Sequence, residues 1–290
     1  MENDFLSVSE IVHKTAENVL TGKIFNSEDC IAVNEKLSFY KGELVILASR
    51  PSIGKSALAL SMAREVALDS KVPVGFCSLG ELNRKRLGMR LLAQVAEIDY
   101  GKIESCTLDA EETESLKLGA DKLSDAPIFI SNETAISIDR LENIIKSMVE
   151  KQHIQAVFID CLEDTGEVNE ITEDVICNVS GDVTDRYRIV VSDILDQLKR
   201  VAEDLHIAVI LLMRIFRSTS GALPSMRSFK GLSNIVRSKA DMILLLSRFR
   251  VPSTVFESDF NIIIPKNRSG KTNLIFGNYL SPYMRFDFRL

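Results

Sequence analysis

Short apolar runs alternate with amphipathic stretches along most of the chain. The runs at 44–49 and 207–213 are almost entirely apolar, which is typical of strands buried on both faces of a parallel sheet. Between such runs, apolar residues recur every three or four positions, as on one face of a helix. The predicted strands are 44–49, 72–79, 127–131, 155–160 and 207–213, and the predicted helices are 55–69, 82–98, 111–124, 137–151 and 189–205. The pattern therefore predicts an α/β fold with a mainly parallel central sheet flanked by helices.

Both ends of the chain depart from this alternation. Strand-like segments with only short turns between them form the C-terminal end, at 241–247, 260–265, 273–278 and 283–288. They predict a hairpin-type C-terminal extension of the sheet. At the N-terminus, residues 6–20 have helical spacing and residues 21–36 are polar with few helix or strand signals. We therefore expect an N-terminal linker helix and linker over 1–36, and one main domain over 37–290.

The composition is that of an ordinary globular protein. Its 290 residues are 46% hydrophobic and 26% charged, which excludes a disordered or fibrous chain. The five cysteines form no C-x-x-C pair, so neither a disulfide framework nor a zinc site is indicated. No apolar run approaches the roughly 20 residues of a membrane span, so we expect a cytoplasmic protein without a membrane partner. The net charge of −6 argues against nucleic-acid binding over the whole surface but allows a local basic path.

A candidate phosphate-binding loop follows the first strand of the main domain. The segment matches the pattern G-x-x-x-x-G-K-[S/T] in all but its first position, and it consists of Ser49, Arg50, Pro51, Ser52, Ile53, Gly54, Lys55 and Ser56. Because a strand enters this loop and a helix leaves it, backbone N–H groups would converge on phosphate oxygens. In such loops the lysine, here Lys55, meets the β- and γ-phosphates of ATP, and the hydroxyl of Ser56 ligates Mg²⁺. ATP and Mg²⁺ are the predicted ligands, and the alternative is a chance G-K-S sequence at a helix start.

A carboxylate at the end of a neighbouring strand is the second part of such a site. Asp160 ends the apolar strand at 155–160 and is the predicted Mg²⁺ partner of Ser56. An acidic residue there also suits a cap for the segment that follows. Its pairing with Lys55 and Ser56 favours the Mg²⁺ role.

These and further motifs occur in an order that resembles the ATPase domain of the DnaB-type replicative DNA helicases. The resemblance extends over residues 39–286 and is carried by the segments 48–56, 78–79, 89–92, 126–130, 159–162 and 263–270. It implies a RecA-like P-loop NTPase fold, a hexameric ring with ATP bound between subunits, and translocation on single-stranded DNA. The implied partners are single-stranded DNA, further copies of the chain, and replication proteins such as a loader or primase.

The resemblance also assigns catalytic roles to Lys266 and Arg268, which match the family's K-x-R segment. They would reach across the subunit interface to the γ-phosphate of ATP bound by the neighbour, as an arginine finger does. A spacing of two places both side chains on one face of a strand. The alternative is a pair of cations that face solvent.

Two positions depart from the family where it places functional side chains. The family ends its second strand with a Glu that activates the attacking water, whereas this chain has Gly80 there and Glu81 one residue later. A one-residue shift turns a strand side chain to the opposite face, although a bend at Gly80 could return the carboxylate of Glu81, the candidate catalytic replacement. Arg214 stands where the family has a Gln that senses the γ-phosphate. ATP binding is therefore better supported than fast hydrolysis.

Basic residues gather in one part of the chain. Residues 207–240 contain no Asp or Glu, and this cationic segment suits a mobile loop that contacts DNA phosphates. The candidate nucleic-acid contacts are Arg186, Arg217, Arg227, Lys230 and Arg237. The alternative is a solvated basic face. The preceding residues, 163–185, are acidic, which repels phosphate and suits either a basic partner or a disordered loop.

Three hypotheses about function follow. The first is an ATP-driven, DnaB-like helicase or translocase that works as a ring. The second is a diverged, hydrolysis-deficient ATP-binding paralogue that regulates a replicative helicase or assembles with it. The third is a RecA-like ATPase of a different branch, of the recombination or clock type, that acts as a conformational switch. Gly80, Arg214 and the segment 231–239, which differs from the corresponding DNA-contacting segment of the family, favour the second. Lys266 and Arg268 favour the first.

Overall fold

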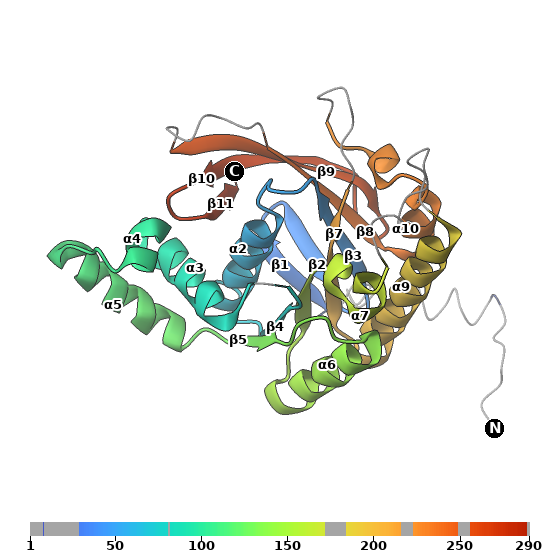
Figure 1. Ribbon diagram of the computed structural model, residues 1–290, viewed down its shortest axis with the longest axis horizontal. Coiled ribbons are helices and arrows are strands. Elements are labelled where there is room, and N and C mark those ends of the chain that lie inside the picture. The colour runs from blue at the N-terminus through green and yellow to red at the C-terminus, as the bar shows by residue number, and fades with distance from the viewer. Residues whose placement is uncertain are drawn as a thin grey trace.

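A computed structural model of the chain describes Val8 and residues 29–80, 82–171, 184–215, 223–248 and 256–288 (Figure 1). The strands are β1 (Cys30–Asn34), β2 (Leu37–Tyr40), β3 (Leu44–Ser49), β4 (Val74–Ser78), β5 (Ile128–Asn132), β6 (Ala156–Asp160), β7 (Ala208–Arg214), β8 (Met242–Arg248), β9 (Glu257–Asn267), β10 (Leu274–Leu280) and β11 (Arg285–Phe288). The helices are α2 (Lys55–Leu68), α3 (Arg84–Ala96), α4 (Tyr100–Ser105), α5 (Ala110–Ser124), α6 (Ile138–Gln152), α7 (Gly166–Asn169), α9 (Asp185–Leu205) and α10 (Ser233–Lys239), and the 3₁₀ turns are η1 (Leu162–Asp164) and η2 (Met226–Phe229). Apart from Val8, the predicted N-terminal helix lies outside the described residues, as do residues 172–183 of the acidic segment.

One large sheet runs through the molecule and carries the phosphate loop. Among the described residues it has nine strands, in the order β11-β10-β9-β8-β3-β7-β6-β4-β5. The strands from β8 to β5 in this order are parallel, and β9, β10 and β11 continue the sheet in antiparallel pairs. The predicted mainly parallel sheet and its hairpin-type C-terminal extension are both confirmed. The segment at 241–247, which was predicted as part of the extension, instead forms β8 and pairs parallel with β3.

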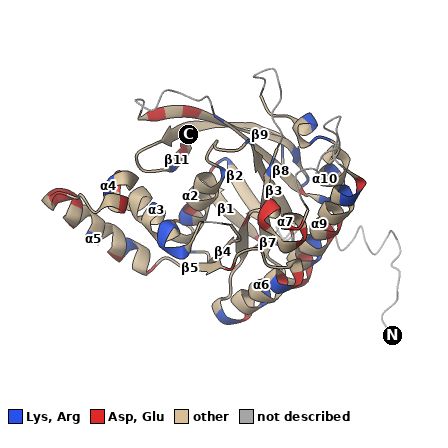
Figure 2. Ribbon diagram, in the orientation of Figure 1, with Lys and Arg blue, Asp and Glu red and all other residues tan. Residues whose placement is uncertain are grey.

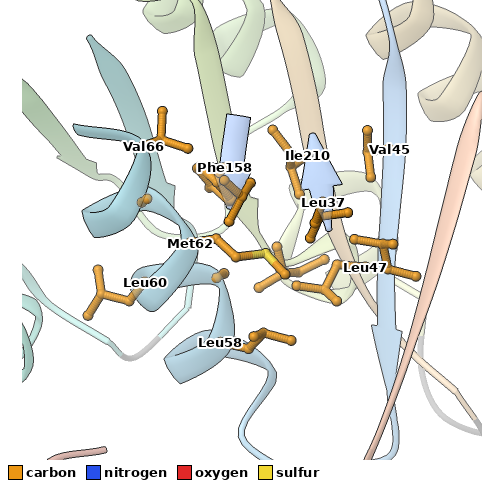
Figure 3. Packing of buried hydrophobic residues seen from close by; sticks show 14 of the residues in the cluster. Leu37, Val45, Leu47, Leu58, Leu60, Met62, Val66, Phe158 and Ile210 are labelled. Carbon is orange, nitrogen blue, oxygen red and sulfur yellow. The ribbon is translucent and has the colours of Figure 1, made fainter. Parts of the chain in front are cut away.

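Helices cover both faces of this sheet. On one face α2 packs with Val45 and Leu47 of β3, as the close view of this cluster shows (Figure 3). On the other face α6 and α9 pack with Leu44 and Ile46 of the same strand. Because successive strand residues point to opposite faces, an apolar β3 serves both layers. None of the described helices is both long enough and apolar enough to cross a bilayer.

The structure contains elements that the sequence pattern did not predict. β1 and β2 form an antiparallel hairpin that begins inside the segment predicted as a linker, 21–36. Ile31 and Val33 alternate with more exposed neighbours and join the core beneath α2, which stabilises a strand in an otherwise polar stretch. α9 begins before the predicted start at 189, because the Thr184 hydroxyl accepts a hydrogen bond from the backbone N–H of Tyr187 and caps the helix.

Candidate functional site

The phosphate loop joins β3 to α2 at the carboxyl edge of the parallel strands. Its backbone turns through two left-handed residues, Ser52 with a φ of 63° and Gly54 with a φ of 104°. A Cβ at Gly54 would lie 3.0 Å from the Phe286 ring in a strained backbone, so glycine suits this position. Gly54 is the N-cap of α2 and supplies no capping side chain. The first N–H groups of α2 are therefore left to the loop and its ligand, which suits a phosphate group.

The environment of the Lys55 side chain indicates an anionic ligand. Its Nζ atom is buried and has no hydrogen-bond partner among the described residues. A buried ammonium group is costly unless a hydrogen-bonded counter-charge is present. Phosphate oxygens would supply both the charge and the hydrogen bonds, so the residue fits the predicted ATP.

Ser56 and Asp160 come together beside Lys55. Asp160 ends β6, is 8% exposed and accepts a hydrogen bond from the Ser56 hydroxyl. Burial raises the pKa of the Asp160 carboxyl, while the positive charge of Lys55 and the Ser56 hydrogen bond oppose the rise. A carboxylate and a hydroxyl are oxygen ligands of the kind that Mg²⁺ prefers, so the pair fits this ion.

These groups line a cleft of about 530 Å³. The predicted loop residues in its wall are Arg50, Pro51, Ser52, Gly54, Lys55 and Ser56. The side chains of Ser49 and Ile53 point elsewhere. Ser49 is fully buried and donates its hydroxyl hydrogen bond to the Arg50 carbonyl at 2.9 Å, and Ile53 packs against the core. These two side chains therefore support the loop rather than line the cleft.

The cleft also contains residues that the sequence analysis missed. Arg90 of α3, Arg248 of β8 and Tyr279 of β10 line it, and the Arg248 guanidinium lies 4.1 Å from the centre of the Tyr279 ring. Arg90 belongs to the segment 89–92, which carries part of the family resemblance, so the sequence could have identified it as a candidate site residue. Arg248 and Tyr279 meet only through the pairing of β8, β9 and β10, whose register the hydrophobic pattern does not fix.

The positions that depart from the family lie in the same cleft. Gly80, Asp164 and Arg214 all line it. Arg214 is tied to two acidic residues, because its guanidinium lies 3.4 Å from Asp164 Oδ1 and its backbone N–H donates to Glu163 Oε1 at 2.6 Å. Glu81, the predicted catalytic carboxylate, lies outside the described residues.

Lys266 and Arg268 lie at the opposite edge of the sheet from the phosphate loop of their own chain. Arg268 donates to Asp241 Oδ1 at 2.9 Å, and the other oxygen of Asp241 accepts from the N–H of Leu44, the first residue of β3. Lys266 donates to the Arg237 and Ala240 carbonyls at the end of α10. The phosphate loop follows the last residue of β3, so neither cation reaches it within one chain.

The cationic segment is helical where the sequence predicts a mobile loop. Residues 226–229 form η2 and residues 233–239 form α10. This segment contributes three buried side chains to the core, those of Phe229, Leu232 and Val236. The prediction of a loop is therefore wrong for 226–229 and 233–239, because apolar residues three and four positions apart anchor helical turns there.

Four of the five predicted nucleic-acid contacts lie on or beside α9, η2 and α10. Arg186 in the first turn of α9, Arg227, Lys230 and Arg237 are all exposed, and Figure 2 shows basic residues over α10 and the segments around it. The Arg237 backbone lies near the amino edge of the sheet, where its carbonyl accepts from Lys266. Arg217 lies outside the described residues.

Solved structures share this fold. A structure described as an ATPase domain has a TM-score of 0.75 and 22% identity, and the match covers 98% of this chain and 99% of that chain. A structure of a DnaB-like replicative helicase, described together with its interactions with primase, has a TM-score of 0.74 and 22% identity, and the match covers 98% of this chain and 67% of that chain.

Sequence relatives point to the same family. The replicative DNA helicase DnaB of Treponema pallidum (strain Nichols) is 24% identical over 277 residues, which cover 93% of this chain and 59% of that protein. The replicative DNA helicase DnaB of Leifsonia xyli subsp. xyli (strain CTCB07) is 25% identical over 256 residues, which cover 85% of this chain and 52% of that protein. The chain thus spans little more than half the length of these relatives. The family model for the DnaB-like helicase C-terminal domain matches residues 32–288, and the chain therefore belongs to this family.

Proposed function

We propose that the chain is the ATPase of a DnaB-like replicative helicase, which binds and hydrolyses ATP and uses the energy to move along single-stranded DNA as a ring. The observation that carries the proposal is the buried Nζ of Lys55, which has no hydrogen-bond partner among the described residues, in a phosphate loop next to the hydrogen-bonded pair of Ser56 and Asp160. A metal–nucleotide complex explains why a buried cation, a helix N-terminus and a hydroxyl–carboxylate pair lie together at one edge of a sheet.

The residues of the loop then have separate tasks. Lys55 holds the β- and γ-phosphates, and the N–H groups at the start of α2 bind their oxygens. Ser56 and Asp160 hold Mg²⁺, which when bound neutralises negative charge on the phosphates. Burial of Asp160 at the end of β6 keeps this carboxylate fixed beside Ser56 and away from bulk water.

The ring is part of the proposal because the catalytic cations are far from their own loop. Arg268 and Lys266 lie at the amino edge of the parallel strands, held by Asp241 and by the end of α10. Arg268 is 52% exposed, so a neighbouring subunit can reach it. We assign it to the γ-phosphate of that neighbour's ATP, with Lys266 beside it.

Single-stranded DNA is the proposed polymer, and its phosphates would meet the exposed cations Arg186, Arg227, Lys230 and Arg237. Replication proteins such as a loader or primase are the proposed partners, since one structural neighbour was described with primase. We place this activity in the cytoplasm.

A second candidate function has its own support. Gly80 removes the family's catalytic carboxylate from that position, and Arg214 is bound to Glu163 and Asp164 instead of standing free for a phosphate. On these grounds the chain could bind ATP without productive hydrolysis and act by assembling with an active helicase.

Steady-state ATP hydrolysis with and without single-stranded DNA separates the two candidates. Lys55→Ala is the background control, and calorimetry with ADP establishes binding in parallel. DNA-stimulated turnover above that background supports the helicase. ADP binding with turnover equal to that of Lys55→Ala supports the assembly role and contradicts the motor.

A further inference from the structure

The carboxylate of Asp164 occupies the space that a side chain at position 80 would fill. A Cβ built on Gly80 would lie 2.7 Å from Asp164 Oδ2 and 3.1 Å from its Cγ. The family places the carboxylate that activates water at position 80, and here the glycine leaves room for a carboxylate from another element. Asp164 belongs to η1, which follows Asp160 within a few residues, and it lines the same cleft as Lys55.

The Asp164 carboxylate is held in place by its neighbours. Cys161 donates its thiol hydrogen bond to Asp164 Oδ2 at 3.0 Å, and the Arg214 guanidinium lies 3.4 Å from Oδ1. A carboxylate fixed from two sides, with 29% of its side chain exposed, can still reach a water molecule in the cleft.

We propose that Asp164 is the catalytic base of this chain, in place of the Glu that the family carries at the position of Gly80. The inference rests on the proposed ATPase function. Asp164 orients a water molecule and accepts its proton. The water oxygen forms a bond to the γ-phosphorus while the bond from that phosphorus to the β–γ bridging oxygen breaks, and its electron pair leaves with ADP. Inorganic phosphate is the second product, and Asp164 returns the proton to solvent.

Three substitutions compare Asp164 with its alternatives. We expect Asp164→Asn to lower ATP turnover by about 100-fold or more, the range typical of a lost general base, while ADP affinity by calorimetry stays within about threefold of wild type. Glu81→Gln, which removes the other candidate carboxylate, should leave most of the turnover. Asp121→Asn is the matched control, since Asp121 is exposed on α5 outside the cleft, and it should behave as wild type in both measurements.

Moving the carboxylate tests whether its position is what counts. Asp164→Ala should lose turnover, and the double variant Gly80→Glu with Asp164→Ala should regain part of it, because the glutamate returns a carboxylate to the vacated space. Gly80→Ala alone should lower turnover, because its Cβ crowds the Asp164 carboxylate.

Each failure has a distinct meaning. Wild-type turnover in Asp164→Asn, or complete loss in Glu81→Gln alone, would overturn the assignment while the ATPase proposal stands. A wild-type chain that binds ADP but hydrolyses no ATP would overturn both the assignment and the motor, and would leave the assembly role. A wild-type chain that binds no nucleotide would overturn the proposed function as a whole.

Discussion

At the scale of single residues, the site is built around one buried charge. Lys55 Nζ lacks a hydrogen-bond partner among the described residues, and Ser56 and Asp160 bond to each other beside it. These three residues could be predicted from the sequence, because a phosphate-loop motif and an acidic residue at the end of a parallel strand both lie at the carboxyl edge of the sheet. Asp164 could not be predicted as a site residue. Its carboxylate occupies the space beside Gly80, and only the packed structure shows this contact.

Replacement of Lys55 should separate stability from binding. Without nucleotide, the free energy of unfolding of Lys55→Met should match that of wild type within about 1–2 kcal/mol. Loss of a buried ammonium group without a hydrogen-bond partner in the described part of the chain offsets loss of the charge that favours the Asp160 carboxylate. With ATP, the wild type should gain stability by mass action, and the variant should gain almost none. Thermal melts of both chains with and without ATP measure this. A large loss of stability in the nucleotide-free variant would show that Lys55 has a structural partner.

At the scale of elements, the C-terminal strands support the phosphate loop. The Phe286 ring of β11 lies against Gly54, and the Phe286 N–H donates to Ser61 Oγ of α2 at 3.1 Å. The sequence pattern predicted the parallel strands because each is an apolar run, and it predicted these antiparallel strands as strand-like segments joined by short turns. It missed β1, since only Ile31 and Val33 mark it, and it did not foresee the contact of β11 with the loop, which depends on strand order.

Two glycines offer a matched test of how tightly β10 and β11 pack. A Cβ at Gly277 would lie 2.3 Å from both the Asp287 carbonyl oxygen and the Phe260 ring, whereas one at Gly88 in α3 meets nothing within 4 Å. Gly277→Ala should therefore destabilise the fold by about 1–3 kcal/mol, and Gly88→Ala should stabilise it by about 0.5–1 kcal/mol. Urea unfolding measures both. Similar effects of the two substitutions would argue against the close packing of these strands.

The end of α2 should make stability depend on pH. Burial raises the pKa of Glu65 from 4.5 to about 7, with Asp69 and Asp287 acting in the same direction and Arg64 opposing them. Between these values the folded chain holds a proton that the unfolded chain lacks, so the free energy of unfolding falls as pH rises from 4.5 to 7. The loss is on the order of 3 kcal/mol.

Glu65→Gln removes this titration. Urea unfolding at pH 5 and at pH 8 should show that the free energy of unfolding of the variant rises relative to that of wild type at the higher pH. If the two chains lose or gain stability in parallel between these pH values, Glu65 does not titrate in that window.

At the scale of the whole molecule, the chain presents two different edges of one sheet. The cleft lies at the carboxyl edge, and Arg268 and Lys266 lie at the amino edge. Membership in the DnaB-like helicase C-terminal domain family contradicts the hypothesis of a RecA-like ATPase from another branch. The sequence motifs identify Lys266 and Arg268 as candidate site residues. Only the strand register shows that both are remote from the phosphate loop of their own chain.

Mixed subunits should reveal catalysis across the interface. Arg268→Ala and Lys55→Ala should each be inactive alone. An equal mixture should hydrolyse ATP at up to about a quarter of the wild-type rate, because random assembly gives that share of interfaces an intact loop and an intact finger. Hydrolysis by reassembled mixtures measures this, and energy transfer between differently labelled subunits confirms that the two variants exchange. No recovery in the mixture, despite exchange, would place Arg268 outside the neighbour's site.

The position of Asp241 has a consequence for communication between subunits. Its carboxylate bonds to Arg268, Lys199 and the N–H of Leu44, so the residue that we propose as the finger is linked to the first peptide of β3, the strand whose far end begins the chain's own phosphate loop. In the proposed ring, a turn of Arg268 toward a neighbour's γ-phosphate would leave the Asp241 carboxylate with its bonds to Lys199 and to the Leu44 N–H. We therefore expect nucleotide bound by one subunit to change the hydrogen bond at the start of β3 in the next subunit of the proposed ring, and hydrogen exchange at the Leu44 amide would measure this change.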